Sequence, residues 1–404
     1  MSSLAPRPFA DYWRPLGDSA ARKVLQSALE FARNCRALIV ACTGRRLADL
    51  PWRDPARALP LDWLDDLAGE PTEPLADDLV IDLAVDPVRI SYERLIPAAV
   101  RKRNGEFHTP SFLADRLVAR LSPAAGQGGD DACFDPCVGG GAFLLALARA
   151  GLPMESTFGI DSNPWALLGA AANAARAERA RLRRPVSEFQ IPVAFADLLA
   201  TENPGWPQFD VLLGNPPWLN WDKLAPANRE RLAPHWRRYG LFAESRMSAI
   251  LGGGKKELAG LVILTALDRF LKPGGRAGFV IPMSLLTARG AGRGFRRFAL
   301  PDGEPLAALA LEDWRATQPF AEAAVHAGLL WLHRGKPTSY PVPVAIIESK
   351  HQEMAASAAP SESDDPLSAW AIGADADRVS LAPLSGKSAY QARLGVNTGG
   401  ANGL

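Results

Sequence analysis

Four consecutive residues, Asn215, Pro216, Pro217 and Trp218, follow an apolar segment and carry the most specific chemistry in the sequence. The two prolines hold the backbone extended and leave the Pro216 carbonyl without a partner in its own segment. The Asn215 amide oxygen and that carbonyl can accept two hydrogen bonds from one planar amine. This holds the amine with its lone pair directed at a methyl donor, and Trp218 offers a face on which an extruded base can stack.

A glycine-rich turn lies upstream, from Asp135 to Phe143. Glycine lets a backbone approach a ligand more closely than a residue with a side chain would. The spacing departs from a dinucleotide fingerprint, and no Gly-Lys-Ser/Thr follows as in a phosphate loop. The residues expected to contact a ligand here are Asp135, Pro136, Gly139, Gly141 and Phe143.

Two further acidic residues follow the next two apolar segments. Asp161, with Ser162, stands where nucleoside-binding sheets hold ribose hydroxyls, although an isolated Asp before Pro164 is more often a helix cap. Asp197, followed by Leu198, is placed to accept the amino group of an adenine. The order of these sites along the chain favours a nucleoside cofactor over unrelated surface residues.

Alternating strands and helices must position these residues. Apolar strands are predicted at 132–134, 156–160, 191–195, 209–213 and 276–281, with further strands at 306–311 and 326–333. Helices are predicted at 142–150, 164–184 and 258–271, and a tight turn at 272–275. This alternation predicts an α/β fold with a doubly wound, mostly parallel sheet.

The 404 residues are divided into three predicted parts. Residues 1–95 form a helical N-terminal domain with amphipathic stretches at 20–50 and 63–82, and residues 96–345 form the catalytic domain. Residues 346–404 are predicted to be a linker and the start of a C-terminal target-recognition region, with a mobile surface loop at 351–366.

Composition excludes several classes of protein. The net charge of +1 means that any nucleic-acid contact depends on local clusters of basic residues. The four cysteines are too few for a secreted disulfide scaffold and do not form a zinc-site pattern. The sequence lacks a signal-peptide pattern, and its most apolar helix candidate, 24–47, is interrupted by charged residues that include Glu30, Arg33, Arg36 and Arg45. We expect a cytoplasmic protein that does not contact membranes.

The motifs together resemble those of the gamma-type adenine-specific DNA methyltransferases, which belong to the N-6 DNA methylase family. Their Asn-Pro-Pro-aromatic motif matches Asn215–Trp218, and their segment Gly-x-Phe-Tyr/His-Thr-Pro matches Gly105–Pro110. Ser91–Leu95 resembles the preceding helix of these enzymes, and 256–282 resembles their fifth-strand motif. The glycine loop departs from the usual pattern, with Cys137 one place early and Gly140 in place of Ser. The resemblance covers residues 90–340.

The resemblance implies the sheet of the S-adenosylmethionine-dependent methyltransferases and an enzyme that methylates the exocyclic amine of a flipped adenine in double-stranded DNA. S-adenosyl-L-methionine is the implied cofactor. The implied setting is host modification in a restriction-modification or phage-defence system such as BREX or DISARM, in which other subunits are the implied protein partners. In these enzymes the Gly-x-Phe segment lies against the methionine end of the cofactor, which adds Phe107, His108, Thr109 and Pro110 to the predicted site.

Basic stretches are candidates for phosphate contacts. The Gly- and Arg-rich segment 289–297 follows the fifth strand and is favoured over Arg101–Arg103. Arg176–Arg184 is expected to form the solvated face of a long helix. The predicted DNA-binding residues are Arg289, Arg293, Arg296 and Arg297.

Two alternatives stay open. The same Asn-Pro-Pro-aromatic motif serves enzymes that methylate a protein glutamine or a guanine amine in RNA. The long segment 219–255 favours a bulky substrate instead. A non-catalytic DNA-binding scaffold is the other alternative, and the intact Asn215, Pro216, Trp218 and Asp161 argue against it.

Overall fold

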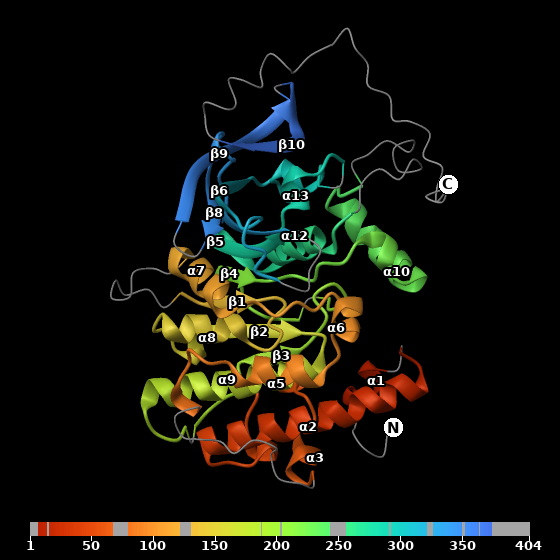
Figure 1. The fold of residues 1–404 in the computed structure, drawn as a ribbon, viewed down its shortest axis with the longest axis vertical. Coiled ribbons are helices and arrows are strands. Elements are labelled where there is room, and N and C mark those ends of the chain that lie inside the picture. Colours follow the sequence, from red (N-terminus) through yellow and green to blue (C-terminus); the bar gives the residue numbers. More distant parts are fainter. Residues whose placement is uncertain are drawn as a thin grey trace.

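The computed structural model describes residues 7–13, 16–67, 80–121, 131–242 and 256–373, except 187, 203, 291, 321–325, 350–351 and 363. These residues form a ten-stranded sheet in the order β10-β9-β8-β6-β7-β5-β4-β1-β2-β3 (Figure 1). The strands are β1 (Cys133–Asp135), β2 (Thr157–Asp161), β3 (Val193–Phe195), β4 (Phe209–Gly214), β5 (Leu271–Pro282), β6 (Leu306–Asp313), β7 (Ala327–Arg334), β8 (Val342–Ser349), β9 (Gln352–Glu362) and β10 (Asp365–Gly373).

The half of the sheet that positions the predicted site is parallel. Strands β3, β2, β1, β4 and β5 pair in parallel, and the strand order reverses between β1 and β4. In sheets of this kind, ligands bind at the carboxyl ends of the strands beside such a reversal. The predicted α/β fold with a doubly wound sheet is confirmed, and the seven predicted strands correspond to β1 to β7.

The other half of the sheet is mostly antiparallel. Strand β7 lies antiparallel between β5 and β6, β8 runs parallel to β6, and β9 and β10 complete the edge as an antiparallel pair. The prediction of a mobile loop at 351–366 is wrong, because most of these residues lie in β9 and β10. Their polar, Ala-rich sequence is held in strands by pairing with β8, since strand formation depends on neighbours more than on intrinsic propensity.

Helices cover the sheet. Helix α8 packs between α7 and α9, and α12 packs on β4 and β5. The helices are α1 (Phe9–Tyr12), α2 (Asp18–Thr43), α3 (Asp62–Asp65), α5 (Pro87–Leu95), α6 (Ala98–Asn104), α7 (Ser111–Leu121), α8 (Ala142–Arg149), α9 (Pro164–Leu182), α10 (Pro226–Arg238), α12 (Leu258–Phe270) and α13 (Ser284–Thr287). Short 3-10 turns occur at η2 (Leu47–Asp49), η3 (Pro55–Arg57), η4 (Met154–Ser156), η5 (Trp221–Lys223) and η6 (Phe295–Arg297).

The N-terminal helices share a core with the sheet layer. Helix α2 packs along α9 (Figure 1). One apolar cluster joins Phe31 of α2, Tyr92 of α5 and Trp165 of α9. Arg176 of α9 is fully buried beneath this layer and donates to Asn173 Oδ1 and to two backbone carbonyls, which corrects the expectation of a solvated face at this residue. Arg181, Arg183 and Arg184 are exposed, as expected.

The turn at 272–275 and the four cysteines can also be compared with their predictions. The predicted turn at 272–275 lies within β5 as an irregularity, because Phe209 pairs with Leu271 and Val211 already pairs with Arg276. All four cysteines are free thiols, as expected. In the part of the chain that the structure describes, none of the helices combines the length and apolar character that crossing a membrane requires. Most of the predicted amphipathic stretch 63–82, and residues 374–404 of the predicted C-terminal region, lie outside the described residues.

Candidate active site

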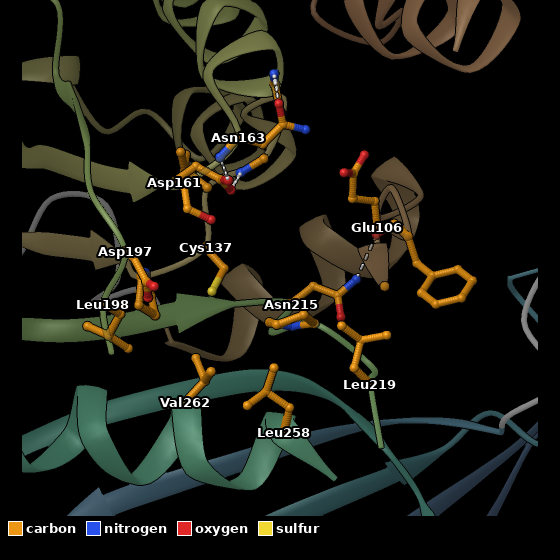
Figure 2. Close-up of a pocket in the computed structure, with 18 of the residues that line it drawn as sticks. Glu106, Cys137, Asp161, Asn163, Asp197, Leu198, Asn215, Leu219, Leu258 and Val262 are labelled. Atoms are coloured by element: carbon orange, nitrogen blue, oxygen red, sulfur yellow. Dashed lines mark hydrogen bonds between the residues drawn. The ribbon is translucent and has the colours of Figure 1, made fainter. Parts of the chain in front are cut away.

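A cavity of about 300 Å³ opens at the carboxyl ends of β1 to β4. Figure 2 shows that side chains from the β1, β2, β3 and β4 ends and from the segment before α7 face it. The predicted residues that line it are Phe107, His108, Thr109, Pro136, Gly139, Phe143, Asp161, Ser162, Asp197, Leu198, Asn215 and Pro217. The predicted residues that do not line it are Pro110, Asp135, Gly141, Pro216 and Trp218.

The glycine loop closes tightly over the start of α9. Gly139 and Gly141 have φ angles of 51° and 86°, in the left-handed region that favours glycine. A Cβ atom on Gly141 would lie 3.1 Å from the Cα atom of Ala170. The loop therefore needs glycine at 141 for packing, while Gly139 presents its backbone to the cavity.

Asp135 lies behind the loop rather than at the cavity surface. Its side chain is 3% exposed, and Oδ1 accepts a hydrogen bond from the Cys137 amide at 2.9 Å. Burial raises the pKa of Asp135 to about 8. A Cβ on Gly214 would lie 2.7 Å from Oδ1, so the end of β4 also depends on this fit. Asp135 shapes the loop and is not placed for the direct cofactor contact that the sequence predicted.

Asp161 faces the cavity, and the neighbouring residue caps the helix. Asn163 is the N-cap of α9, because its Oδ1 accepts from the Trp165 and Ala166 amides. Asp161 instead accepts from the Gly139 amide at 2.8 Å and the Asn163 amide at 2.8 Å (Figure 2). The alternative in which Asp161 is a helix cap is wrong. Burial raises the pKa of its carboxyl to about 6.

Asp197 lies at the end of β3, next to helix α10. One carboxylate oxygen accepts from the Leu199 amide, and the other lies 3.3 Å from Arg231 Nη2. Arg231 and Leu232 belong to α10 and line the cavity. The long segment that the sequence assigned to a bulky substrate thus also forms a wall beside Asp197.

Asn215 is held in one orientation at the other side of the cavity. Its Nδ2 donates to the Phe107 carbonyl at 3.0 Å and to Thr109 Oγ1 at 3.2 Å (Figure 2). A carbonyl can only accept, so the amide nitrogen must face Phe107, and the amide oxygen points the other way. That oxygen is buried and has no hydrogen-bond partner among the described residues.

His108 lies between Phe107 and Thr109, the two residues to which Asn215 donates, and it lines the same cavity. Burial, together with the positive charges of Arg101 and Arg89, lowers the pKa of His108 to about 3. The imidazole is therefore neutral at physiological pH. Its Nε2 is buried and has no hydrogen-bond partner among the described residues, so it can serve a ligand in the cavity.

Trp218 packs in an aromatic cluster behind the cavity wall. Its side chain is buried, with ring centroids 5.6 Å from Phe107 and 4.9 Å from Phe320. Phe107 lines the cavity, and Phe320 comes from the connection between β6 and β7. A base that stacks on Trp218 must therefore displace or join these two rings.

The predicted DNA-contacting arginines differ in how far their side chains are exposed to solvent. Arg289 is exposed, and Arg297 is exposed while donating to the Gly240 carbonyl. Arg293 pairs with Asp365. Arg296 is 2% exposed and donates to the carbonyls of four residues, so its prediction as a DNA contact is corrected to a structural role. Those four carbonyls belong to Leu285, Leu286, Ala288 and Leu367.

Several site residues were not predicted from the sequence. Glu106 lines the cavity and accepts hydrogen bonds from the hydroxyls of Tyr12 and Tyr92. Glu106 occupies the variable position of its motif, and no motif includes Tyr12. Phe320 and Arg231 were missed because only the fold brings their segments to the site.

A match to the N-6 DNA Methylase family extends over residues 90–362, about two thirds of the sequence. The chain belongs to the N-6 DNA methylase family. The resemblance drawn from the motifs is confirmed at the level of the family. No curated protein matches the sequence.

Solved structures of restriction-modification enzymes share the fold. The type IIL enzyme MmeI, in complex with DNA, aligns with a TM-score of 0.50 at 14% identity, over 87% of this chain and 59% of MmeI. The Type ISP enzyme LlaGI, with a DNA substrate mimic, aligns with a TM-score of 0.50 at 12% identity, over 81% of this chain and 36% of LlaGI. The structure of the DrdV–DNA complex aligns with a TM-score of 0.50 at 13% identity, over 76% of this chain and 35% of the DrdV chain. This chain thus spans between 35% and 59% of these proteins.

Proposed function

We propose that this N-6 DNA methylase transfers a methyl group from S-adenosylmethionine to the exocyclic amine of an adenine rotated out of DNA. The observation that carries the proposal is the buried Asn215 Oδ1, an acceptor that has no partner among the described residues and is fixed by two anchors on Nδ2. An exocyclic amine supplies the missing donor. The Pro216 carbonyl is proposed as the second acceptor, so that both amine hydrogens are held and the nitrogen lone pair is oriented.

The cavity residues fit the cofactor. Asp161 has a carboxylate at the cavity for the ribose hydroxyls, and Asp197 has one for the adenine amino group. Leu198, Leu258 and Val262 provide an apolar surface between them and Asn215 that suits a purine ring (Figure 2). When bound there, S-adenosylmethionine supplies a methyl group activated by its sulfonium.

The aromatic cluster is proposed to hold the target base. Adenine in a duplex cannot place its amine in a closed pocket, so it must leave the base stack. Phe107 lines the cavity beside Asn215, Trp218 packs against Phe107 behind the cavity wall, and Phe320 lies against Trp218. Stacking on such rings returns about 1–3 kcal/mol per base, which offsets part of the cost of extrusion.

The biological setting is proposed from the family and its structural relatives. We propose a cytoplasmic enzyme that modifies host DNA in a restriction-modification or phage-defence system. Double-stranded DNA is its substrate, and recognition of the target sequence depends on further protein elements or subunits. Arg289, Arg293 and Arg297 are proposed to contact phosphates.

The experiment is performed in cells. The gene is expressed with its neighbouring genes in a host without adenine methylation, and chromosomal nucleosides are measured by mass spectrometry. N6-methyladenine with the wild-type protein, and none with Asn215→Ala, is the expected result. The same mass spectrometry is applied to RNA nucleosides and to protein digests from these cells. Methylated guanine in RNA or methylated glutamine in protein, without N6-methyladenine in DNA, would replace the proposal with that alternative, and no methylation in any of the three would favour a non-catalytic scaffold.

A further inference from the structure

The segment that follows the Asn-Pro-Pro-Trp motif forms one wall of the cavity. Its described part, residues 219–242, contains helix α10. Asn228, Arg231 and Leu232 of this helix line the cavity. Because Arg231 and Leu232 follow Asn228 by three and four residues, the three side chains share one face of the helix. That face therefore belongs to the ligand site, although the sequence assigned the segment to a bulky substrate.

Helix α10 is anchored on the core of the domain. Leu232 and Trp236 are buried, and the Trp236 ring lies 5.2 Å from the ring of Trp221. After the end of the helix, the Tyr239 hydroxyl donates to Asp268 of α12 at 2.8 Å. These contacts hold the helix in place, so a side chain on its cavity face has a defined position relative to the ends of the strands.

Arg231 of α10 meets Asp197, which follows β3. Arg231 Nη2 lies 3.3 Å from Asp197 Oδ2, and Asp197 Oδ1 accepts from the Leu199 amide at 2.9 Å. Each carboxylate oxygen therefore has one anchor. A carboxylate offers about four acceptor positions, so about two remain for a ligand in the cavity that Asp197 lines.

The ion pair contributes little to the stability of the fold. The side chains of Arg231 and Asp197 are 41% and 38% exposed, and ion pairs with this exposure have small effects on unfolding. Figure 2 shows Asp197 beside Leu198 at one end of the cavity, with Glu106 at the other. The pair therefore acts on the part of a ligand that lies at the Asp197 end.

We propose that Arg231 is a positioning residue for Asp197 and thereby determines the selectivity of the cofactor site for a purine with an amino group at C6. The inference rests on the proposed function, because it takes adenosine as the part of the ligand that meets Asp197. A carboxylate can only accept, so it binds a 6-amino group and repels a 6-oxygen. Arg231 and the Leu199 amide hold one oxygen each, and the oriented carboxylate presents its remaining acceptor positions to the amine.

The test is calorimetric binding of two ligands to the full chain. S-adenosylhomocysteine has the amino group at C6, and S-inosylhomocysteine has an oxygen there and is otherwise the same. Arg231→Met removes the guanidinium and keeps an apolar side chain. It should weaken S-adenosylhomocysteine by about three- to tenfold and S-inosylhomocysteine by less than about twofold, so the preference for the amino ligand falls.

A double-mutant cycle shows whether Arg231 acts through Asp197. Asp197→Asn should remove most of the preference by itself, because an amide can donate to a 6-oxygen as well as accept from a 6-amine. In the Asp197→Asn background, Arg231→Met should change the Kd of S-adenosylhomocysteine by less than about twofold.

Arg238→Met is the matched control. Arg238 lies on the same helix and also pairs with a carboxylate, that of Asp268 at 3.2 Å, but it does not line the cavity. The control should bind both ligands as the wild type does, and thermal unfolding should confirm that each variant folds.

Four results with Arg231→Met would overturn the inference. Unchanged binding would remove Arg231 from the site, and equal weakening of both ligands would show that it only shapes the wall. Tighter binding of S-adenosylhomocysteine would show that Arg231 competes with the amine for Asp197. Weakening of the same size in the Asp197→Asn background would show that it does not act through Asp197. A wild type that binds neither ligand would instead refute the proposed function itself.

Discussion

The Asn215 side-chain amide donates to the backbone carbonyl of Phe107 at 3.0 Å, which joins the end of β4 to a segment about a hundred residues earlier. This bond, with the second one to Thr109, decides which way the amide faces. The orientation leaves Oδ1 buried without a partner among the described residues. The segment Gly105–Pro110 therefore fixes the orientation of the Asn215 side chain, although the two motifs are far apart in the sequence.

The roles of Asp161 and Asn163 predict a variant that weakens cofactor binding while the cap of helix α9 stays in place. Asp161→Asn should raise the Kd for S-adenosylmethionine about ten- to hundredfold, because charge-assisted bonds to the ribose hydroxyls are lost. The unfolding midpoint should also fall, because asparagine has one side-chain oxygen for the two backbone amides that the carboxylate serves, while the helix cap that Asn163 provides is kept. Calorimetry and thermal unfolding measure the two effects.

Asp210→Asn is the control for that variant. Asp210, near the start of β4, accepts a hydrogen bond from the Ala132 amide and pairs with Lys272, and it does not line the cavity. Its cofactor affinity should equal that of the wild type. Unchanged affinity in Asp161→Asn would remove Asp161 from the cofactor site.

Cofactor affinity should depend on pH through Asp161. The pKa of this carboxyl is raised to about 6 by burial, so the ionised form that accepts two hydroxyls is lost as pH falls below about 6. The Kd should rise by up to about tenfold per pH unit there, and binding near pH 6 should release a proton. His108, with a pKa of about 3, stays neutral over this range.

Titration calorimetry from pH 5 to 7 in two buffers of different ionisation enthalpy measures both effects. Asp161→Asn should show a flat profile. A wild-type Kd that is constant over this range contradicts the assignment of Asp161 to the ribose.

The aromatic cluster predicts how Trp218 acts. Trp218→Ala should slow methylation strongly on a paired adenine and less on an adenine opposite a gap, because extrusion is easier there. Trp218→Phe should keep much of the activity, since a stacking face remains. Single-turnover rates on oligonucleotides containing the true site measure the difference. An equal slowing of Trp218→Ala on both substrates would assign the residue to packing instead.

Substitution of Arg289 and of Arg296 should have opposite effects on DNA binding and on stability. Arg296→Gln should lower the unfolding free energy by about 2 kcal/mol or more, because four carbonyls around a buried guanidinium lose donors. Arg289→Gln should leave stability unchanged, weaken DNA binding and lower the salt slope by about 1. Binding isotherms at several salt concentrations and thermal unfolding of both variants provide the measurements. The reverse pattern would contradict the burial of Arg296.

The parallel half of the fold was predictable because local pattern and tertiary contacts agree there. Strand β4 is apolar, its end carries Asn215, and the carboxyl ends of parallel strands meet at one edge. The sequence order of Asp161, Asp197 and Asn215 therefore indicated a shared site. Helix boundaries at Pro164 and after Phe270 also followed from local residues.

The rest depends on contacts between distant segments. Strand β9 contains few β-branched residues and is exposed at its start, so pairing with β8 holds it in place rather than propensity. The sequence pattern predicted surface positions for Arg176 and Arg296, because only the fold surrounds their guanidinium groups with carbonyls. Tyr12 reaches Glu106 through the packing of α1 on α9, which no local pattern contains.

The most direct measurement compares Asn215→Ala and Asn215→Asp with the wild type for cofactor affinity and for single-turnover methyl transfer to DNA. Alanine removes the acceptor, and aspartate places an oxygen against the Phe107 carbonyl, which cannot donate to it. Both variants should bind S-adenosylmethionine within a few-fold of wild type and lose about a hundredfold or more in transfer rate. A variant that keeps the wild-type transfer rate, or loses affinity and rate by the same factor, would contradict the role of Asn215 in holding the target amine.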